Sequence, residues 1–344
     1  MIAAEHDVAS WGSEVAVGAS ERWTVRSSAV RPTTGRRIDC VDAARGVAVV
    51  AMLAANLVNV FFEDIPPVLA HNQGNSLRLF DLPAPVFQLL VGVSLPLFLA
   101  SRAAAGRSAG EARRDALRRY AWLVLLGIAL DSAGRLTLVP QWGVLQTLGL
   151  GGMVATLLAT ASDRTVVAAS LALLAVFVTG SSGEVHGGPF AAFAFVPLTL
   201  LGLVAGRALV RMPRDAFAVW ASRLGAGAFA LALVLAAGGV PFNKLHGSSS
   251  FVALAAGAAM AVLAATAAAE EAPRGHPRWL LSVGRNALTA WVTLYVFVYY
   301  PAWIVVPTWH RLTPTAGVLA VALVTGAICT STVALGRRGI RVPL

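Results

Sequence analysis

Long apolar stretches alternate with short polar segments along most of the chain, and this pattern predicts helices that cross a membrane. A helical span needs about 20 predominantly apolar residues, and helices are expected because lipid cannot satisfy open backbone groups. The expected helices cover about residues 41–62, 82–100, 117–134, 137–160, 165–180, 189–209, 217–239, 251–269, 280–300 and 314–335. The predicted fold class is therefore an all-α polytopic membrane protein, a bundle of about ten transmembrane helices.

Composition supports the same fold class. The chain has 344 residues, of which 57% are hydrophobic and 13% charged, and its mean hydropathy is +0.71. That share of charge is about half of the usual one in soluble domains, so a soluble enzyme or a nucleic-acid-binding module is excluded as a description of the whole chain. The two cysteines, Cys40 and Cys329, lie in or beside apolar stretches, so no disulfide framework and no metal-binding cysteine pattern is expected.

The first 36 residues differ from the rest. They mix polar, acidic and basic residues and contain no apolar core of 7–15 residues, so they do not read as a signal peptide. We expect residues 1–36 to be a loosely ordered cytoplasmic tail and residues 37–344 to form the membrane domain.

The formal net charge of +10 and the pI of about 11.0 raise the question of a nucleic-acid partner, which the position of the charges answers. With the ten expected helices and a cytoplasmic N-terminus, 23 basic residues fall on the cytoplasmic side and 4 on the other. This asymmetry follows the positive-inside rule, so both termini are expected in the cytoplasm. The arginines then set the topology in a lipid bilayer, and no nucleic-acid partner is expected.

Polar residues gather in the segments expected on the outer face, at about residues 63–81, 181–188, 240–250 and 301–313. Four of the six histidines fall there, namely His71, His186, His246 and His310. Polar residues beside membrane helices often line a cavity or a site. His71 has no Cys or Glu at metal-ligand spacing, and histidine is a common general acid or base, so His71 is a candidate catalytic residue.

Other polar residues have two interpretations each. Asp42 and Arg45 share a helix face, where they form either an ion pair that anchors the helix or a basic lip for an anionic ligand. Asn56 either bonds to a neighbouring helix or takes part in chemistry. Asp81 precedes Pro83 and is a good helix cap, or else it orients His71.

The segment before the helix expected at 251–269 combines the only lysine of the chain with polar neighbours. Its residues either bind polar groups of a substrate or form a solvated turn; they are Asn243, Lys244, Ser248 and Ser250. The chain contains no Walker loop, Rossmann glycine pattern, GxSxG or HExxH. Common ATPase, dehydrogenase, serine hydrolase and zinc-protease chemistry is therefore not expected, nor is a metal site.

Five short motifs in chain order resemble the heparan-alpha-glucosaminide N-acetyltransferase family of membrane acyltransferases, which has many bacterial relatives. The matching residues are Asp42, Arg45, Gly46 and Asn56; His71, Asp81, Leu82, Pro85 and Gly92; residues 143–146; Asn243, Lys244, Ser248, Ser250, Phe251 and Val252; and residues 284–288. The resemblance implies transfer of an acyl group, here acetyl, from cytoplasmic acetyl-CoA to an amine or hydroxyl of an acceptor at the outer face. It also implies the plasma membrane of a bacterium as the location.

The resemblance also implies roles for individual residues. His71 is the expected general base, Asn56 the donor to the carbonyl oxygen, and Asp81 the group that orients His71. Residues expected to bind coenzyme A are Arg37, Asp42, Arg45, Gln146, Arg285 and Asn286. Those expected on the acceptor side are Asn243, Lys244, Ser248 and Ser250. An acetyl-His71 intermediate is the competing scheme.

Some features differ from the family pattern, and other classes of function remain. Residues 72–76 replace an aromatic-Asn-Gly run, and His246 and Gly247 replace Leu and Trp, so a sugar acceptor is not assumed. Related acyltransferases allow a homodimer, for which the sequence shows no interface. A small-molecule transporter or exporter would also have ten spans, and it would move substrate without coenzyme A. An assembly protein would use the polar residues only to hold helices together.

Overall fold

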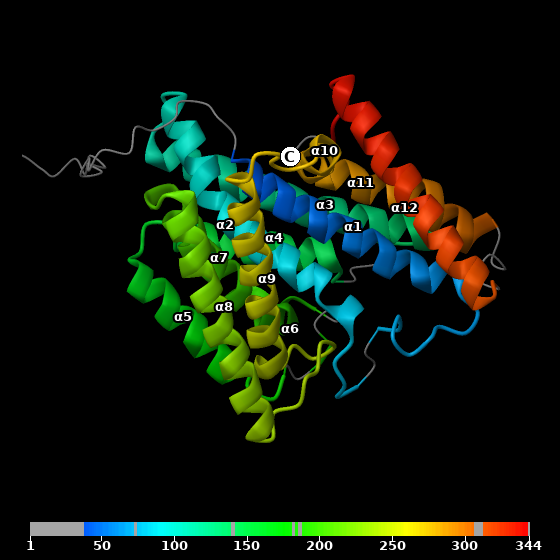
Figure 1. Ribbon diagram of the computed structural model, residues 1–344, viewed down its shortest axis with the longest axis horizontal. Coiled ribbons are helices and arrows are strands. Elements are labelled where there is room, and N and C mark those ends of the chain that lie inside the picture. The colour runs from blue at the N-terminus through cyan, green and yellow to red at the C-terminus, as the bar shows by residue number, and fades with distance from the viewer. Residues whose placement is uncertain are drawn as a thin grey trace, which may run out of the picture. The chain divides into compact units, whose positions relative to one another are not determined.

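The computed structural model describes residues 38–71, 74–138, 142–180, 183–184, 188–305 and 312–342, without the side chains of 303 and 305. The expected tail 1–36 and Arg37 lie outside these residues. Apart from one isolated bridge between Phe62 and Leu312, the regular elements of the described residues are helices. Figure 1 shows their arrangement.

The helices follow the predicted apolar windows closely. Their bounds are α1 Asp39–Phe61, α2 Pro83–Ala104, α3 Ala109–Arg135, α4 Val144–Leu157, α5 Asp163–Val176, α6 Pro189–Ala192, α7 Val196–Arg211, α8 Arg214–Ala237, α9 Ser249–Glu270, α10 Arg278–Arg285, α11 Ala287–Leu294 and α12 Pro314–Arg337. Single 3₁₀ turns, Leu79–Asp81 and Phe193–Phe195, precede α2 and α7. Two π-helical segments, Tyr295–Tyr299 and Pro301–Val305, follow α11.

The number of spans is smaller than the ten expected from the apolar pattern. Within the described residues, six helical segments are long and apolar enough to cross a membrane: Asp39–Phe61, Leu79–Ala104, Pro189–Arg211, Arg214–Ala237, Ser249–Glu270 and Pro314–Arg337. The bent pair of α10 with α11 and its continuation makes a seventh. The protein is thus an all-helical membrane protein, whereas the count of ten spans is not confirmed.

Two physical features account for the difference. Both α4 and α5 have 14 residues, which gives each a length of about 21 Å against a hydrocarbon core of about 30 Å. With 27 residues α3 is long enough, but Arg118, Arg119 and Asp131 interrupt its apolar part. Both α4 and α5 pack against α7, and α4 also packs against α3, so these helices are integrated into the bundle.

The window expected as one helix at 280–300 is broken. The chain bends by 75° between α10 and the helix that begins at Ala287. Asn286 sits at the bend with φ −117° and ψ 32°, outside the helical range, and its side-chain amide donates to the carbonyl oxygen of Ser282 at 2.8 Å. The bend brings the end of α10 and the start of α11 to the rim of a cavity described below.

Glycines allow two pairs of helices to approach closely. A methyl group added at Gly284 of α10 would overlap the backbone of Asp42 in α1, and one added at Gly46 would overlap the backbone of Leu280. Gly92 of α2 and Gly202 of α7 make the same kind of backbone contact. Small residues at such contacts are characteristic of helix packing in membranes.

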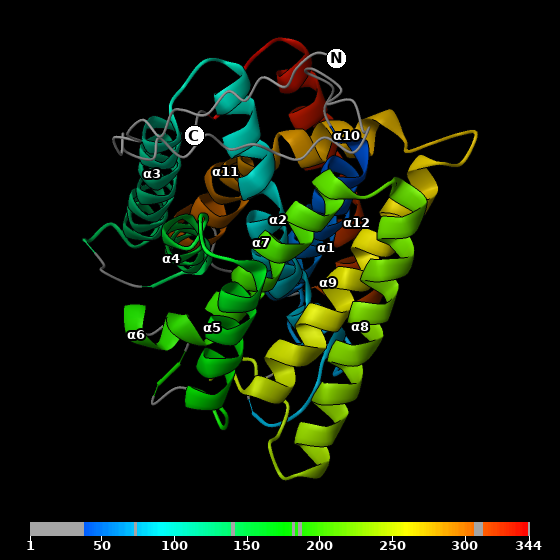
Figure 2. The ribbon, with the colours of Figure 1, turned by 90° about the vertical axis from the view of Figure 1, so that its left-hand side faces the viewer.

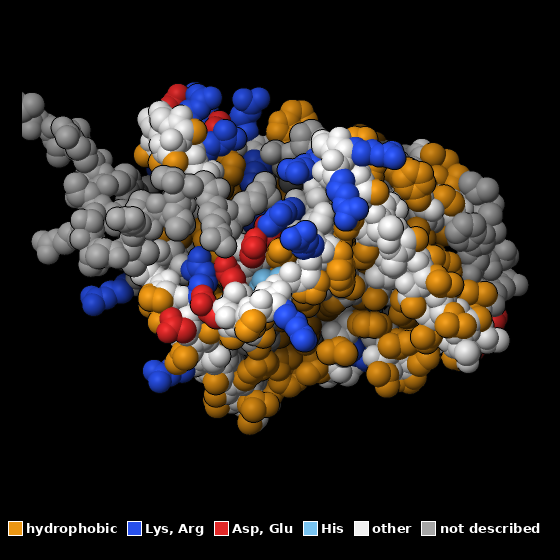
Figure 3. All heavy atoms as spheres, turned by 45° about the horizontal axis from the view of Figure 1, so that its top comes forward, with side chains coloured by type: hydrophobic (Ala, Val, Ile, Leu, Met, Phe, Trp, Pro, Cys, Tyr) orange, Lys and Arg blue, Asp and Glu red, His pale blue; other side chains and the backbone are white. Residues whose placement is uncertain are grey.

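The bundle has two chemically different ends. We call the end where α1 begins and α2 and α9 finish the arginine end, and the opposite one the histidine end. At the arginine end, Glu270 at the end of α9 accepts a hydrogen bond from the backbone N–H of Cys40 at 3.1 Å. Figure 2 shows α10 near the start of α1, and the loop that follows α1 at the other end. Figure 3 shows basic side chains gathered on the arginine end and hydrophobic ones over the flanks.

Candidate functional site

Three ionisable side chains meet at the histidine end of the bundle. Nδ1 of His71 lies 3.3 Å from Oδ1 of Asp81 and 3.3 Å from Nζ of Lys244. The ammonium of Lys244 is also 3.3 Å from the same oxygen of Asp81. The Asp81 side chain is fully buried, whereas the side chain of His71 is 26% exposed. We call these three residues the histidine cluster.

Each member of the histidine cluster comes from a different loop or helix start. His71 lies in the loop after α1, Asp81 ends the 3₁₀ turn before α2, and Lys244 belongs to the loop between α8 and α9. Leu82, not Asp81, occupies the N-cap position of α2, so the predicted capping position is one residue off. Burial lowers the pKa of Lys244 below its ordinary value, and the charge of Asp81 partly offsets this effect.

The other residues predicted on the acceptor side hold this loop together. The hydroxyl groups of Ser248 and Ser250, both buried, donate to the carbonyl oxygen of Pro241 at 2.7 Å each. The side-chain amide of Asn243 donates to Oδ1 of Asn75 at 2.7 Å, which joins the loop of Lys244 to the loop of His71. These contacts position Lys244 within the histidine cluster.

Asn56 is bonded within the helical bundle. Its Nδ2 donates to the carbonyl oxygen of Met52 at 2.7 Å, and its Oδ1 accepts from the hydroxyl of Tyr299 at 2.7 Å. Tyr299 belongs to the first π-helical segment, so Asn56 ties α1 to that irregular stretch. This matches the interpretation of Asn56 as a residue that bonds to a neighbouring helix, and its role as a donor to a reacting oxygen stays a prediction.

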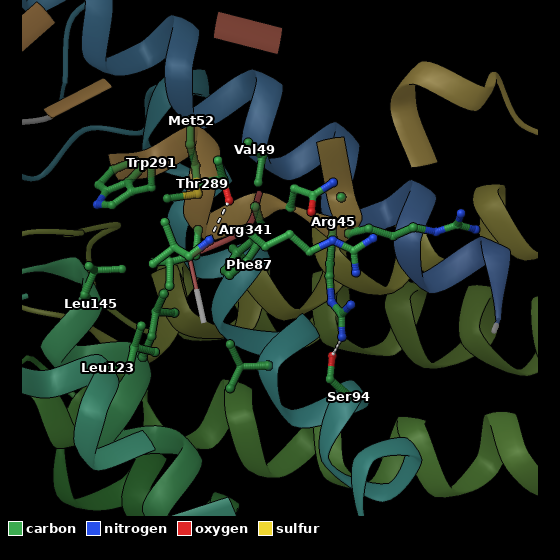
Figure 4. Close-up of a pocket in the computed structure, with 18 of the residues that line it drawn as sticks. Arg45, Val49, Met52, Phe87, Ser94, Leu123, Leu145, Thr289, Trp291 and Arg341 are labelled. Carbon is green, nitrogen blue, oxygen red and sulfur yellow. Dashed lines mark hydrogen bonds between the residues drawn. The ribbon is translucent and has the colours of Figure 1, made fainter. Parts of the chain in front are cut away.

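A cavity of about 260 Å³ opens at the arginine end. Four arginines of different helices and of the C-terminal segment line it, together with apolar residues deeper in; the arginines are Arg45, Arg119, Arg285 and Arg341. In Figure 4, Arg45 and Ser94 lie at one side of the cavity and Trp291 and Leu145 at the other. Arg45 donates a hydrogen bond to the hydroxyl of Ser94. We call this space the arginine cavity.

Aspartates pair with two of the four arginines that line the arginine cavity. Asp42 pairs with Arg45 at 3.2 Å and with Arg285 at 2.8 Å, and Asp39 pairs with Arg285 at 2.8 Å. Within the described part of the chain, Arg119 and Arg341 have no carboxylate partner. The arginine cavity therefore keeps an excess positive charge at Arg119 and Arg341. Asp42 orients two of the arginines, and its role in binding coenzyme A stays a prediction.

Asn286 lines the arginine cavity with an acceptor that has no hydrogen-bond partner among the described residues. Its buried Oδ1 is this unused acceptor, while its Nδ2 is bonded to Ser282. Gln146, by contrast, is fully buried, does not line the arginine cavity, and donates to Oδ2 of Asp131 at 2.9 Å. Of the six residues predicted to bind coenzyme A, Arg45, Arg285 and Asn286 line the arginine cavity.

Arg119, Arg341 and Ser94 are not among the site residues that the sequence predicts. Both arginines were assigned only to topology, because an arginine that sets orientation looks like any other in a sequence. A usable signal for Arg341 was present, since the chain contains no acidic residue after Glu271. An arginine in such a stretch finds no local ion-pair partner.

The histidine cluster and the arginine cavity are separate. Arg45 and Phe61 lie about 24 Å apart along α1, and Met52 marks the deep end of the arginine cavity about 10 Å from Arg45. His71, Asp81 and Lys244 are not among the residues that line it. In this conformation of the described residues, about 14 Å of α1 lies between the deep end of the arginine cavity and the end of the helix from which the loop of His71 begins.

Taken together, the fold and these two sites define a polytopic helical membrane protein with an arginine-lined cavity at one end and a histidine–carboxylate pair at the other. Residues 37–234, more than half of the chain, match the family model of the heparan-alpha-glucosaminide N-acetyltransferase catalytic domain. The chain belongs to this family, which makes it a membrane acetyltransferase by family. A comparison with curated proteins gave no match.

Proposed function

We propose that the protein transfers an acetyl group from acetyl-CoA, bound at the arginine end, to an amine or hydroxyl of an acceptor bound near His71. The observation that carries this proposal is the arginine cavity, whose excess positive charge suits the phosphates of the coenzyme. Acetyl-CoA is the donor in acetyltransferases of this family, which supports the choice of anion.

The residues of the arginine cavity fit the parts of the donor. Arg119 and Arg341 offer guanidinium groups for phosphate oxygens, for which arginine geometry is well suited. The unused Oδ1 of Asn286 can accept a hydrogen bond from an amide N–H of the pantetheine arm. The volume of about 260 Å³ is below the range of about 300–1,000 Å³ for complete ligand pockets, so the nucleotide part would remain at the mouth.

At the histidine end, the geometry supports His71 as general base. If Nδ1 of His71 donates its hydrogen to Asp81, the lone pair lies on Nε2 and can accept a proton from the acceptor. The acceptor atom then forms a bond to the thioester carbonyl carbon, the bond from this carbon to sulfur breaks, and the coenzyme leaves as a thiolate. A positioned general base contributes about 10²–10⁴-fold to such a reaction. The acetyl-His71 scheme uses the same lone pair as the nucleophile.

Transfer requires a movement that connects the two sites. The wall between them includes Met52, Leu145 and Trp291, and behind it Tyr299 bonds to Asn56. Tyr299 lies in a π-helical stretch, a form often found at functional sites because its hydrogen bonding is easily rearranged. We assign the opening movement to residues 295–305.

The proposed orientation puts the arginine end in the cytoplasm. Both described ends of the chain carry basic residues at this end, as the positive-inside rule requires of a cytoplasmic face. The membrane in question is then the plasma membrane of a bacterium, and the acceptor is an amino sugar, a glycan or a small metabolite.

Two experiments test the proposal. Purified protein in detergent should bind acetyl-CoA, and Arg45→Ala should bind it more weakly; no binding by either protein would refute the donor site. Incubation with labelled acetyl-CoA and a panel of amines and sugars should then label one acceptor class, with His71→Ala as the blank and His276→Ala as the matched control.

The covalent scheme has its own test. In a single turnover without acceptor, labelled acetyl-CoA should leave no label on the protein if His71 acts as a base. Label that is retained by the wild type and lost in His71→Ala would establish the acetyl-His71 intermediate instead.

A further inference from the structure

A second cavity lies next to the arginine cavity and shares Thr289, Arg341 and Val342 with it. This groove has a volume of about 330 Å³ and is lined mainly by apolar side chains. The groove is lined by Thr289, Val292, Thr293, Val296, Phe297, Leu335, Ile340, Arg341 and Val342. Neither the acyl-transfer chemistry nor the arginine cavity explains it.

The floor of the groove is one continuous helix face. Residues 289, 292, 293, 296 and 297 are spaced by three and four positions, so they form a stripe along α11 and the first π-helical segment. The stripe extends about 12 Å along the helix. Exposure increases along it, from buried Thr289 to Phe297, whose surface is 70% exposed. A stripe of this shape suits an extended hydrocarbon chain.

The C-terminal segment closes the groove at the arginine end. After α12 the chain reverses at Gly339, whose φ of +76° favours glycine, and the N–H of Ile340 donates to the carbonyl oxygen of Leu335 at 3.0 Å. The backbone N–H of Val342 then donates to Oγ1 of Thr289 at 3.2 Å, which joins this segment to α11. Arg341 is thereby held where it borders both the groove and the arginine cavity.

The chain segment at this end of the groove carries charge of a single sign. From Ala272 to the end of the chain there is no Asp or Glu, whereas Arg337, Arg338 and Arg341 follow one another closely. An apolar groove that ends at arginines matches an anionic lipid, because the acyl chain and the phosphate then each have a suitable partner.

We propose that the groove binds one anionic phospholipid, with its acyl chain along the stripe of α11 and its phosphate on Arg341. This inference does not depend on acetyl transfer, because it needs neither the donor nor His71. The occupant is a lipid rather than a soluble phosphate because the apolar stripe makes up most of the lining.

The test is lipid binding to the complete purified protein, measured by native mass spectrometry in the absence of acetyl-CoA. Phosphatidylglycerol should be retained about fivefold more strongly than phosphatidylcholine, since one basic residue near a membrane surface contributes about 1 kcal/mol. Arg341→Gln should remove this preference. Arg274→Gln, which deletes the same charge from an exposed position outside the groove, should leave it intact.

A second pair of variants tests the groove itself. Val292→Trp should reduce retention of phosphatidylglycerol, whereas Leu319→Trp, on an exposed face of α12, should not. The proposal would be overturned if the wild type and Arg341→Gln retained phosphatidylglycerol and phosphatidylcholine in the same ratio. It would also be overturned by full displacement with glycerol 3-phosphate, which would indicate a headgroup site without the groove, or by a dimer in which a second copy fills the groove.

Discussion

At the scale of single residues, the histidine cluster pairs the buried carboxylate of Asp81 with the imidazole of His71 and the ammonium of Lys244. Asp81 is fully buried and shares contacts of 3.3 Å with His71 and Lys244. A buried carboxylate is costly unless it is paired, so Lys244 stabilises the fold as well as the site. The role of Lys244 is thus best tested by separating these two contributions.

Lys244→Met should lower the free energy of unfolding by about 3 kcal/mol, because it leaves Asp81 without its ammonium partner. This value is at the lower end of the range for buried pairs, since the Lys244 side chain is 19% exposed. The double variant Asp81→Asn/Lys244→Met should recover most of the loss, as measured by thermal unfolding in detergent. A double variant as unstable as Lys244→Met alone would contradict the pairing.

The unpaired arginines of the cavity give a second prediction. Arg119→Gln and Arg341→Gln should each weaken acetyl-CoA binding by about tenfold, since a hydrogen bond to a charged group contributes about 1.5 kcal/mol or more. Arg102→Gln, which removes a charge paired with Asp115 outside the arginine cavity, should change binding little. Isothermal titration with acetyl-CoA distinguishes a specific contact from a general effect of net charge.

Much of the candidate site can be predicted from the sequence, and the failures have physical causes. His71, Asp81 and Lys244 were singled out by their polarity beside apolar windows, and the structure brings them together. Ser248 and Ser250 were not distinguishable from ligand-binding hydroxyls, because nothing in the sequence shows that their partner is the carbonyl oxygen of Pro241.

At the scale of elements, glycines determine how closely helices pack. Gly92 and Gly202 bring the backbones of α2 and α7 into contact, and Gly46 and Gly284 do the same for α1 and α10. The second contact also holds Asp42 beside Arg285 at the rim of the arginine cavity. Close packing of α1 against α10 therefore helps to determine the geometry of the arginine cavity.

Gly202→Val should destabilise the protein by about 1–3 kcal/mol, because the added side chain overlaps the backbone of α2. Gly227→Val is the matched control: Gly227 also lies within a long helix, and a methyl group there meets no atom within 4 Å. Unfolding temperatures in detergent measure the difference. Equal temperatures for the two variants would show that α2 and α7 can separate without cost.

Helix positions were predicted well, but the bend and the lengths of the short helices were not. Apolar windows place α1, α8, α9 and α12 to within a few residues, because long lipid-compatible segments dominate the pattern. The bend at Asn286 was not predicted, although Gly284, Arg285 and Asn286 interrupt the apolar window 280–300, because such an interruption also occurs in straight helices. The window at 137–160 overestimates α4, because apolar residues in a loop resemble apolar residues in a helix.

At the scale of the whole molecule, the separation of charges predicts how the protein lies in the membrane. In a variant without Cys40 and Cys329, a cysteine at exposed Val68 should react with an impermeant maleimide added to intact cells. A cysteine at exposed Ala105 should react only after the membrane is permeabilised. Labelling in the reverse order would show that the arginine end faces outward.

The wall formed by Met52, Leu145 and Trp291 has a consequence for the cell. A thioester that waits in a pocket open on both sides would be hydrolysed by external water, and small ions would leak through the same opening. If acetyl-CoA binds in the arginine cavity as proposed, the apolar side chains at the inner end of this cavity keep the thioester away from external water, and keep the membrane closed to ions, until an acceptor binds. An enzyme that works in this way must separate these apolar side chains briefly in every catalytic cycle. A transporter opens its closed pathway in the same manner, although here only an acetyl group crosses.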